Sequence, residues 1–280
     1  MKKENTLLVG LAMVAAISAV TYAILVAPGQ IAGVNMTSGV THSSKIIYEL
    51  HMIILWICIV IGVLVFAAMF TSIYLHRKSR GAVAAQFSHS TKAEIIWTVI
   101  PILILVILAI PSTKTLIDLA DSSDPDLTIK ITGYQWKWKY EYLDSGISFF
   151  SSLDAASNEA RRVGSNIEPT SVENYLLDVD NRVVIPAGKK VVFLITADDV
   201  IHSWWVPALG WKQDAIPGFI NEGWTRVNEP GVYRGQCAEL CGKDHAFMPI
   251  VLEVKSEEDY AAWVANQKQT STAIAQLNNG

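Results

Sequence analysis

Three long apolar stretches occupy most of the first 120 residues of the chain. The first, residues 6–27, follows Lys2 and Lys3 and ends in the letters LVAPGQ. A short positive head followed by an apolar run is typical of a secretory signal, but about 20 apolar residues can also cross a bilayer. No clean A-x-A cleavage site is present. Residues 1–29 are therefore predicted to be a signal peptide or an N-terminal anchor.

The second and third apolar stretches predict a transmembrane hairpin over residues 30–118. Its helices are expected at about 46–76 and 93–116. The second of these helices contains Pro101 and Pro111, and membrane helices tolerate internal proline. The hairpin predicts that membrane lipid surrounds this part of the chain.

Basic residues in the loop between the two helices predict which side of the membrane it faces. Positive charge in short loops marks the cytoplasmic side, so the chain that follows the hairpin is expected outside. This orientation agrees with an export signal at the start of the chain and predicts a multi-pass protein of a bacterial inner membrane with a periplasmic C-terminal domain. The basic residues near the helix ends are Arg77, Lys78, Arg80 and Lys92.

After Pro125 the apolar pattern changes from the helical period to short β-branched and aromatic runs bounded by Gly, Pro, Asp and Asn. Runs at this spacing are typical of a β-sandwich or barrel, which is predicted over residues 125–256. In YQWKWKYEY, residues 134–142, the alternation predicts a single strand with its aromatic side chains on one face. The predicted strands are residues 127–132, 134–142, 174–179, 182–186, 189–196, 231–236 and 248–254.

Two segments of this region do not follow the strand pattern. Residues 144–173 are expected to form a long loop with about one helical turn at most. Ser256 and Asp259 resemble a capping box, which predicts a short helix at the start of residues 257–280, followed by a flexible tail.

Charge separates the two halves of the chain, although the formal net charge of the whole is only −4. Residues 1–111 carry seven basic and three acidic side chains, whereas the remaining 169 residues carry 15 basic and 23 acidic ones. An acidic domain repels nucleic acid and attracts basic partners. Nucleic-acid binding is therefore not expected.

The segment GQCAELCGKDHAFMP places two of the three cysteines of the chain beside a histidine and a methionine. Exported proteins readily form disulfides, but a bridge between Cys237 and Cys241 closes a very small loop and leaves His245 and Met248 unexplained. Zinc binds cysteine and histidine, whereas a thioether suits copper better. The donor types therefore favour copper over zinc or a disulfide.

Two cysteines are enough for both sulfur atoms to bridge two metal ions, but such a site needs a second imidazole. His202, in DVIHSWW directly after a predicted strand, is the best candidate for it. The remaining histidines lie in or beside the predicted membrane part: His42, His51, His76 and His89.

From about residue 45 to about 265 the chain resembles subunit II of the haem–copper cytochrome c oxidases. The resemblance is carried by EIIWTVIP, GYQWKWKYEY, DVIHSWW, KQDAIPG and GQCAELCGKDHAFMPI. It implies a cupredoxin-like Greek-key β-barrel for residues 125–256, and a centre of two copper ions called CuA. The implied ligands are the imidazoles of His202 and His245, the bridging thiolates of Cys237 and Cys241, the thioether of Met248 and the backbone carbonyl of Glu239.

The resemblance also implies an oxidoreductase subunit, with the oxygen chemistry carried out elsewhere. Reduced cytochrome c, a separate protein, would donate electrons to CuA, and haem in subunit I would receive them. Subunit I holds that haem and the copper ion CuB, reduces O2 to water and translocates protons across the membrane. The implied partners are therefore subunit I, the other oxidase subunits and cytochrome c.

Further residue roles follow from the same resemblance. Trp136 is implied to accept electrons from cytochrome c, the alternative being one of several packing aromatics. Glu94 is implied to lie at the mouth of a proton pathway into subunit I, the alternative being a carboxylate that stabilises a helix start. The Glu239 carboxylate is implied to bind a Mg or Mn ion shared with subunit I. Acidic residues implied to dock cytochrome c are Glu141, Asp178, Asp180 and Asp199.

Three rival functions differ from this one in specific features. Quinol oxidase subunits lack the copper ligands, and variants with a fused cytochrome c carry a C-x-x-C-H motif that this chain does not have. An exported copper carrier would need neither the hairpin, nor Trp136, nor the acidic residues at the subunit I interface. Co-purification with a haem-bearing membrane subunit separates the carrier from the oxidase.

Overall fold

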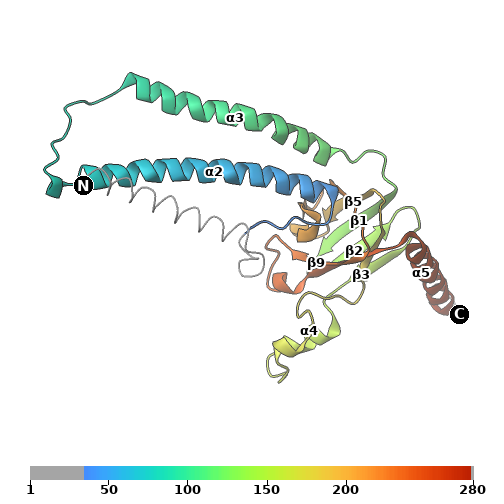
Figure 1. Ribbon diagram of the computed structural model, residues 1–280. Coiled ribbons are helices and arrows are strands. Elements are labelled where there is room, and N and C mark those ends of the chain that lie inside the picture. Colours follow the sequence, from blue (N-terminus) through green and yellow to red (C-terminus); the bar gives the residue numbers. More distant parts are fainter. Residues whose placement is uncertain (1–34, 279–280) are drawn as a thin grey trace. The chain divides into compact units, whose positions relative to one another are not determined.

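The computed structural model describes residues 35–278, and the chain divides into two compact units (Figure 1). One unit contains Tyr48–Thr115 and is helical. The other contains Ser38–Ile47 together with the chain from Leu116 onward, and it holds all the named strands of the described residues. The signal or anchor predicted over residues 1–29 lies outside the described residues.

Two long apolar helices follow each other in the chain: α2, His42–Leu75, and α3, Thr91–Ala120. Their most apolar windows have mean hydropathies of 3.1 and 2.7, and both helices are long and apolar enough to cross a membrane. Both are longer than predicted, and α3 continues through Pro101 and Pro111. The connection between them contains one short helical turn, η1, Lys78–Arg80.

Side chains of the residues around the start of α2 satisfy its first backbone groups. The Thr41 N–H donates to Ser44 Oγ at 3.0 Å, and the Ser44 N–H donates to Thr41 Oγ1 at 2.9 Å. This reciprocal pair works as a capping box does, with serine in place of glutamate. The Thr41 hydroxyl also donates to the Leu209 carbonyl at 2.9 Å, which attaches the first turn of α2 to the β-domain.

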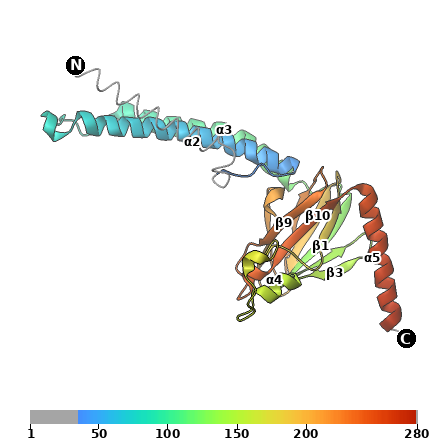
Figure 2. The same ribbon diagram turned by 60° about the horizontal axis from the view of Figure 1, so that its bottom comes forward.

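The β-domain consists of two five-stranded sheets, ordered β3-β2-β1-β5-β8 and β4-β10-β9-β6-β7 (Figure 2). The first sheet contains β1 Leu127–Tyr134, β2 Lys137–Tyr142, β3 Ser148–Ser151, β5 Val191–Ala197 and β8 Asn221–Thr225. The second contains β4 Val183–Pro186, β6 His202–Trp205, β7 Lys212–Ala215, β9 Gly231–Cys237 and β10 Pro249–Lys255. The pairs β1–β5 and β4–β10 are parallel and the rest antiparallel. The predicted fold class, a two-helix anchor followed by a cupredoxin-like Greek-key barrel, is confirmed.

Alternating aromatic residues of β2 form much of the core between the two sheets. Trp138, Tyr140 and Tyr142 are all buried. The Tyr142 hydroxyl donates to the Val184 carbonyl and accepts from the Val184 N–H, both at 2.8 Å. Tyr140 accepts from the indole N–H of Trp204 at 3.2 Å. Because β2 lies in one sheet and the partners in the other, these bonds connect the two layers while satisfying buried polar groups.

Two predicted strands are wrong. The strand expected over residues 134–142 is broken by a turn at Gln135 and Trp136, after which β2 pairs antiparallel with β1. Alternation alone does not reveal this turn, because no Gly, Asn or Asp marks it. The strand expected over residues 174–179 is replaced by a turn at 174–176 and an isolated bridge of Val179, since Asn174 and Leu176 have φ angles of 51° and 62°, in the left-handed region that ends a strand.

Other elements were missed or only partly predicted. Residues 144–173 contain β3 and two short helices, α4 Ala155–Ala160 and η2 Pro169–Ser171. Strands β6, β7 and β8 are short and contain several polar residues, so they lack the apolar pattern by which the other strands were predicted. Ser256 does cap α5, Glu257–Asn278, which is longer than the short helix expected there.

Candidate metal centre

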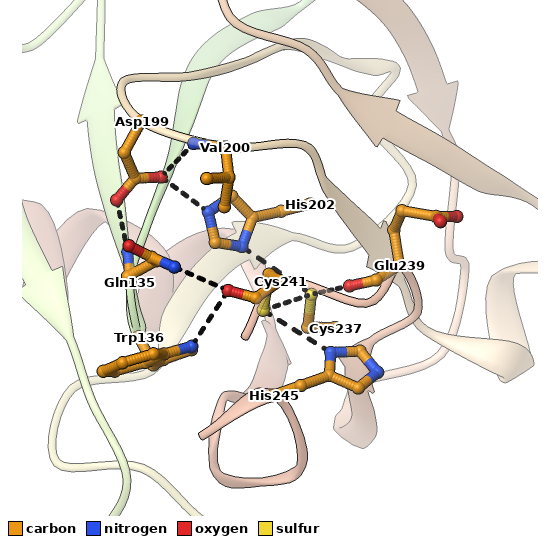
Figure 3. A network of polar contacts seen from close by, with 9 residues as sticks. All are labelled: Gln135, Trp136, Asp199, Val200, His202, Cys237, Glu239, Cys241 and His245. Carbon is orange, nitrogen blue, oxygen red and sulfur yellow. Dashed lines mark hydrogen bonds and ion pairs between the residues drawn. The ribbon is translucent and has the colours of Figure 1, made fainter. Parts of the chain in front are cut away.

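The two cysteines of the GQCAELCGKDHAFMP segment and the predicted histidines meet at one end of the β-domain (Figure 3). Cys237 Sγ lies 3.8 Å from Cys241 Sγ and 3.9 Å from His202 Nδ1. Cys241 Sγ lies 3.5 Å from His245 Nδ1. The donor atoms of His202, Cys237 and Cys241 all lie within 4.8 Å of one another. The structure therefore brings together residues that are up to 43 positions apart in the chain.

Neighbouring strands hold these side chains in place. His202 begins β6 and Cys237 ends β9, and the two strands pair through Trp204 and Cys237. The Cys237 N–H donates to the Met248 carbonyl at 3.0 Å, which connects the end of β9 to the start of β10. Gly133 of β1 passes so close that an added Cβ would lie 2.8 Å from the His202 ring. The imidazole is therefore held between two strands.

The chemistry of this donor set fits copper ions. Both cysteines are free thiols, and their sulfur separation of 3.8 Å is far from the roughly 2.05 Å of a disulfide. The Glu239 carbonyl oxygen lies 3.4 Å from Cys237 Sγ, and Met248 is buried beside the loop. Thiolates, imidazoles and a thioether are the soft and intermediate donors that copper binds in proteins.

The two thiols of the site differ in acidity. Burial opposes ionisation of Cys237, but hydrogen bonds from His202 and from backbone groups lower its pKa to about 7. Burial and the negative charge of Cys237 raise the pKa of Cys241 to about 12. Two adjacent buried thiolates repel each other, so a bound cation would stabilise the doubly ionised pair and release protons.

Asp199 orients the imidazole of His202. His202 Nε2 lies 2.9 Å from Asp199 Oδ1, and the same carboxylate accepts the Gln135 N–H at 2.7 Å and the Val200 N–H at 2.6 Å. Burial raises the pKa of the Asp199 carboxyl, but these bonds outweigh it and hold that pKa below its usual value. When Nε2 donates to Asp199, Nδ1 presents its lone pair toward the sulfur atoms, as in carboxylate–histidine–metal arrangements.

The turn between β1 and β2 supplies two donors to the same loop. Gln135 Nε2 donates to the Cys241 carbonyl at 2.7 Å, and the indole N–H of Trp136 donates to it at 3.2 Å. Trp136 is half-buried at the tip of the hairpin. The sequence did not point to Gln135 or to the hydrogen bond of Asp199. The only signals were the position of Gln135 before Trp136, and the three-residue spacing of Asp199 and His202.

Replacing Asp199 by asparagine is expected to weaken copper binding, because the neutral amide loses the charge-assisted bond to His202. Removing a residue that is hydrogen-bonded to a metal ligand typically lowers metal affinity by about 10- to 100-fold. The measurement is copper competition with a chelator on the full chain. Asp198→Asn is the matched control, since it removes the same charge from an adjacent exposed position. Equal affinities in the two variants would contradict this role of Asp199.

The four predicted docking acids lie in the β-domain, and each already has partners there. One of them, Asp199, contacts the candidate metal ligand described above. The partners of the other three are Lys139 and Lys130 for Glu141, Arg234 and Arg182 for Asp178, and the backbone N–H groups of Ser152 and Asn181 for Asp180. None of these four carboxylates is therefore unpaired, and the domain is acidic through its net charge.

The remaining predicted residues lie outside the sulfur cluster. Glu94 is in the first turn of α3, in the helical unit. The carboxylate of Glu239 is exposed and points away from the sulfur atoms (Figure 3). The histidines that were set aside lie in α2 or in its connection to α3: His42, His51, His76 and His89.

Comparison with known proteins identifies the family of both parts of the chain. Residues 127–255 match the profile "Cytochrome C oxidase subunit II, periplasmic domain", and residues 29–115 match "Cytochrome C oxidase subunit II, transmembrane domain". The periplasmic domain of subunit II of cytochrome oxidase from Bradyrhizobium japonicum is 41% identical and covers 53% of this chain and 98% of that one, with a TM-score of 0.46.

Two bacterial proteins match over most of this chain. A probable cytochrome c oxidase subunit 2 of Rickettsia felis is 53% identical over 68% of this chain, which spans only 57% of the length of that protein. Cytochrome c oxidase subunit 2 of Cereibacter sphaeroides is 40% identical, and the alignment covers 79% of this chain and 77% of that protein. Together with two apolar helices and a β-domain that gathers cysteines and histidines, these matches show that the chain belongs to the cytochrome c oxidase subunit II family.

Proposed function

We propose that this chain is the electron-accepting subunit of a cytochrome c oxidase and holds a CuA centre. The observation that carries the proposal is the pair of buried, unbridged thiols 3.8 Å apart, with an imidazole nitrogen beside each. The proposed ligands are His202, His245, Cys237, Cys241, Met248 and the carbonyl of Glu239. When bound, two copper ions would supply one-electron transfer between cytochrome c and haem in subunit I, where O2 is reduced and protons are translocated.

The contribution of this chain is to position and shield the ligands. Asp199 holds the His202 ring in one tautomer, and the bonds from Gln135 and Trp136 hold the loop at Cys241. His202 and both cysteines are buried, which keeps water from the sulfur atoms. A ligand set held by strands from both sheets needs little rearrangement when its charge changes, which favours rapid electron transfer.

Two measurements test this proposal in the native membrane. The chain should co-purify with a haem-bearing subunit, and reduced cytochrome c should bleach the copper absorbance of the complex within a turnover. A chain that binds copper but purifies without haem would instead be a copper carrier.

Replacing Trp136 by phenylalanine is expected to slow the reduction of the oxidase by cytochrome c without loss of copper. The Trp136 ring joins the surface to a ligand residue through its N–H bond to the Cys241 carbonyl, and phenylalanine cannot make that bond. Stopped-flow reduction by cytochrome c measures the effect. Trp205→Phe is the control, since Trp205 is also partly exposed but lies on β6. Normal reduction of the Trp136→Phe variant would contradict this role.

Docking of cytochrome c is proposed to depend on the overall negative charge of the domain, including Glu141, Asp178, Asp180 and Asp199. The chain after residue 111 carries 23 acidic and 15 basic side chains, which favours a basic partner. Because Glu141, Asp178 and Asp180 have partners within the domain, neutralising any one of these three should have a small effect on the KM for cytochrome c. The KM for cytochrome c should instead rise with ionic strength, and a KM independent of salt would contradict steering.

Glu94 and the Glu239 carboxylate are proposed to serve subunit I. The proposed membrane orientation places residues 76–90 in the cytoplasm and the β-domain in the periplasm. Glu94, in the first turn of α3, would lie at the mouth of a proton pathway, and Glu239 is exposed as a shared Mg or Mn ligand must be. Unchanged oxygen turnover in Glu94→Ala, or unchanged manganese content in Glu239→Gln, would contradict the respective role. Protease accessibility in sealed vesicles tests the orientation.

A further inference from the structure

The loop from Cys241 to Met248 carries three of the proposed ligands and contains one short 3-10 helix, η4, His245–Phe247. Its backbone bonds include His245 N–H to the Gly242 carbonyl at 3.2 Å and Phe247 N–H to the Asp244 carbonyl at 2.9 Å. Both of these bonds stay within the loop. Gln135 and Trp136 hold the start of the loop, since both donate to the Cys241 carbonyl and the Lys243 ammonium lies 5.6 Å from the centre of the Trp136 ring. The position of His245 also depends on what holds the residues on either side of it.

Arg161, at the end of α4, contacts the middle of this loop through two residues that flank His245. Arg161 Nη1 lies 3.2 Å from Asp244 Oδ1, and the guanidinium carbon lies 4.3 Å from the centre of the Phe247 ring. Arg161 Nε also donates to Asn158 Oδ1 at 2.8 Å, within α4. One side chain therefore joins α4 to both sides of a proposed imidazole ligand.

These contacts are stronger candidates for a structural role than an ordinary surface ion pair. The side chains of Arg161 and Asp244 are only 27% and 25% exposed. A planar guanidinium can pair with a carboxylate along its edge while its face stacks on an aromatic ring, and each contact restricts the other. Asn158 fixes the remaining edge, so the Arg161 side chain is already ordered when it contacts the loop.

We propose that Arg161 is a positioning residue for the metal centre. By holding Asp244 and Phe247, it orders the loop before metal binds and fixes the direction of the His245 ring. The part of this inference that concerns metal rests on the proposed function, whereas the ordering of the loop does not. Pre-ordering lowers the entropy lost when ligands close around an ion, which raises affinity and slows release.

The test compares Arg161→Gln with Arg162→Gln in the full chain. Arg162 is the next residue, its side chain is 63% exposed and it pairs with Glu159 of α4 at 2.8 Å, so it is a matched control. In Arg161→Gln, copper should leave to a chelator about 10-fold faster, the lower end of the range for groups hydrogen-bonded to a metal ligand, because Arg161 acts through the neighbours of His245. Hydrogen exchange at residues 242–247 should also be faster in the metal-free chain. Arg162→Gln should behave as the wild type does.

Equal copper release and equal loop exchange in the two variants would overturn the inference. Combining Arg161→Gln with Asp244→Asn gives a second check, because two changes that break one contact should have less than additive effects. Additive effects would show that Arg161 acts elsewhere. If Arg161→Gln fails to fold, Arg161→Lys carries the same comparison, with smaller changes expected. A wild-type chain that binds no copper would refute the proposed function, while the exchange measurement still decides the role of Arg161.

Discussion

Replacing either Cys237 or Cys241 by serine is expected to abolish the two-copper centre. A serine hydroxyl keeps nearly the size of the thiol but is not ionised near neutral pH and is a poor ligand for copper. The chain should then hold at most one copper ion, and cytochrome c oxidation should fall by more than the roughly 10- to 100-fold loss that follows removal of a residue hydrogen-bonded to a metal ligand. Metal analysis and oxygen uptake measure the two effects.

The third cysteine provides the control for these variants. Cys58 lies in α2, in the helical unit, and is exposed in the chain. Cys58→Ser should therefore keep the wild-type copper content and turnover. Retention of two coppers by Cys237→Ser or by Cys241→Ser would contradict bridging by both sulfurs.

Replacing Gly235 by alanine is expected to be among the most destabilising small changes in the β-domain. A Cβ at this position would overlap the carbonyl oxygen of Trp205 and lie 2.8 Å from the Cα of Val206, and both are backbone atoms that cannot rotate away. Strands β9 and β6 would have to separate where Trp204 pairs with Cys237. A cost of about 3 kcal/mol in the free energy of unfolding is expected from such overpacking.

Gly231→Ala is the matched control on the same strand. The atom nearest to its added Cβ is the hydroxyl oxygen of Tyr233, at 3.0 Å, which is the far end of a flexible side chain. Its effect should stay within about 1 kcal/mol. Thermal unfolding of the full chain measures both variants, and Gly235→Ala should also lose copper because its strand carries Cys237. Equal unfolding temperatures for the two variants would show that β6 and β9 leave room for a Cβ at Gly235.

The sequence predicted those parts of the fold that local patterns determine. Two apolar helices and the strands with nearly continuous apolar runs, such as β5 and β10, were found close to their actual bounds. The site could be proposed because the chemistry of Cys237, Cys241, His245 and Met248 is concentrated in one short segment. His202 was the one ligand found at a distance, and the resemblance to a known family supported it.

Features that depend on contacts distant in sequence could not be predicted. The turn at Gln135 and Trp136 lies in a run that alternates as a strand does, yet it brings both side chains to Cys241, over 100 positions away. Asp199 was assigned to partner docking because only the structure shows its bond to His202. Arg161 lay in what was expected to be a loop, and its contacts cross more than 80 positions.

Copper analysis combined with electron paramagnetic resonance of the purified full chain tests the central claim most directly. The account predicts two copper ions per chain in the oxidised state, sharing one unpaired electron that couples to both nuclei. One copper ion per chain, two independent spins, or a disulfide between Cys237 and Cys241 in the active complex would contradict it.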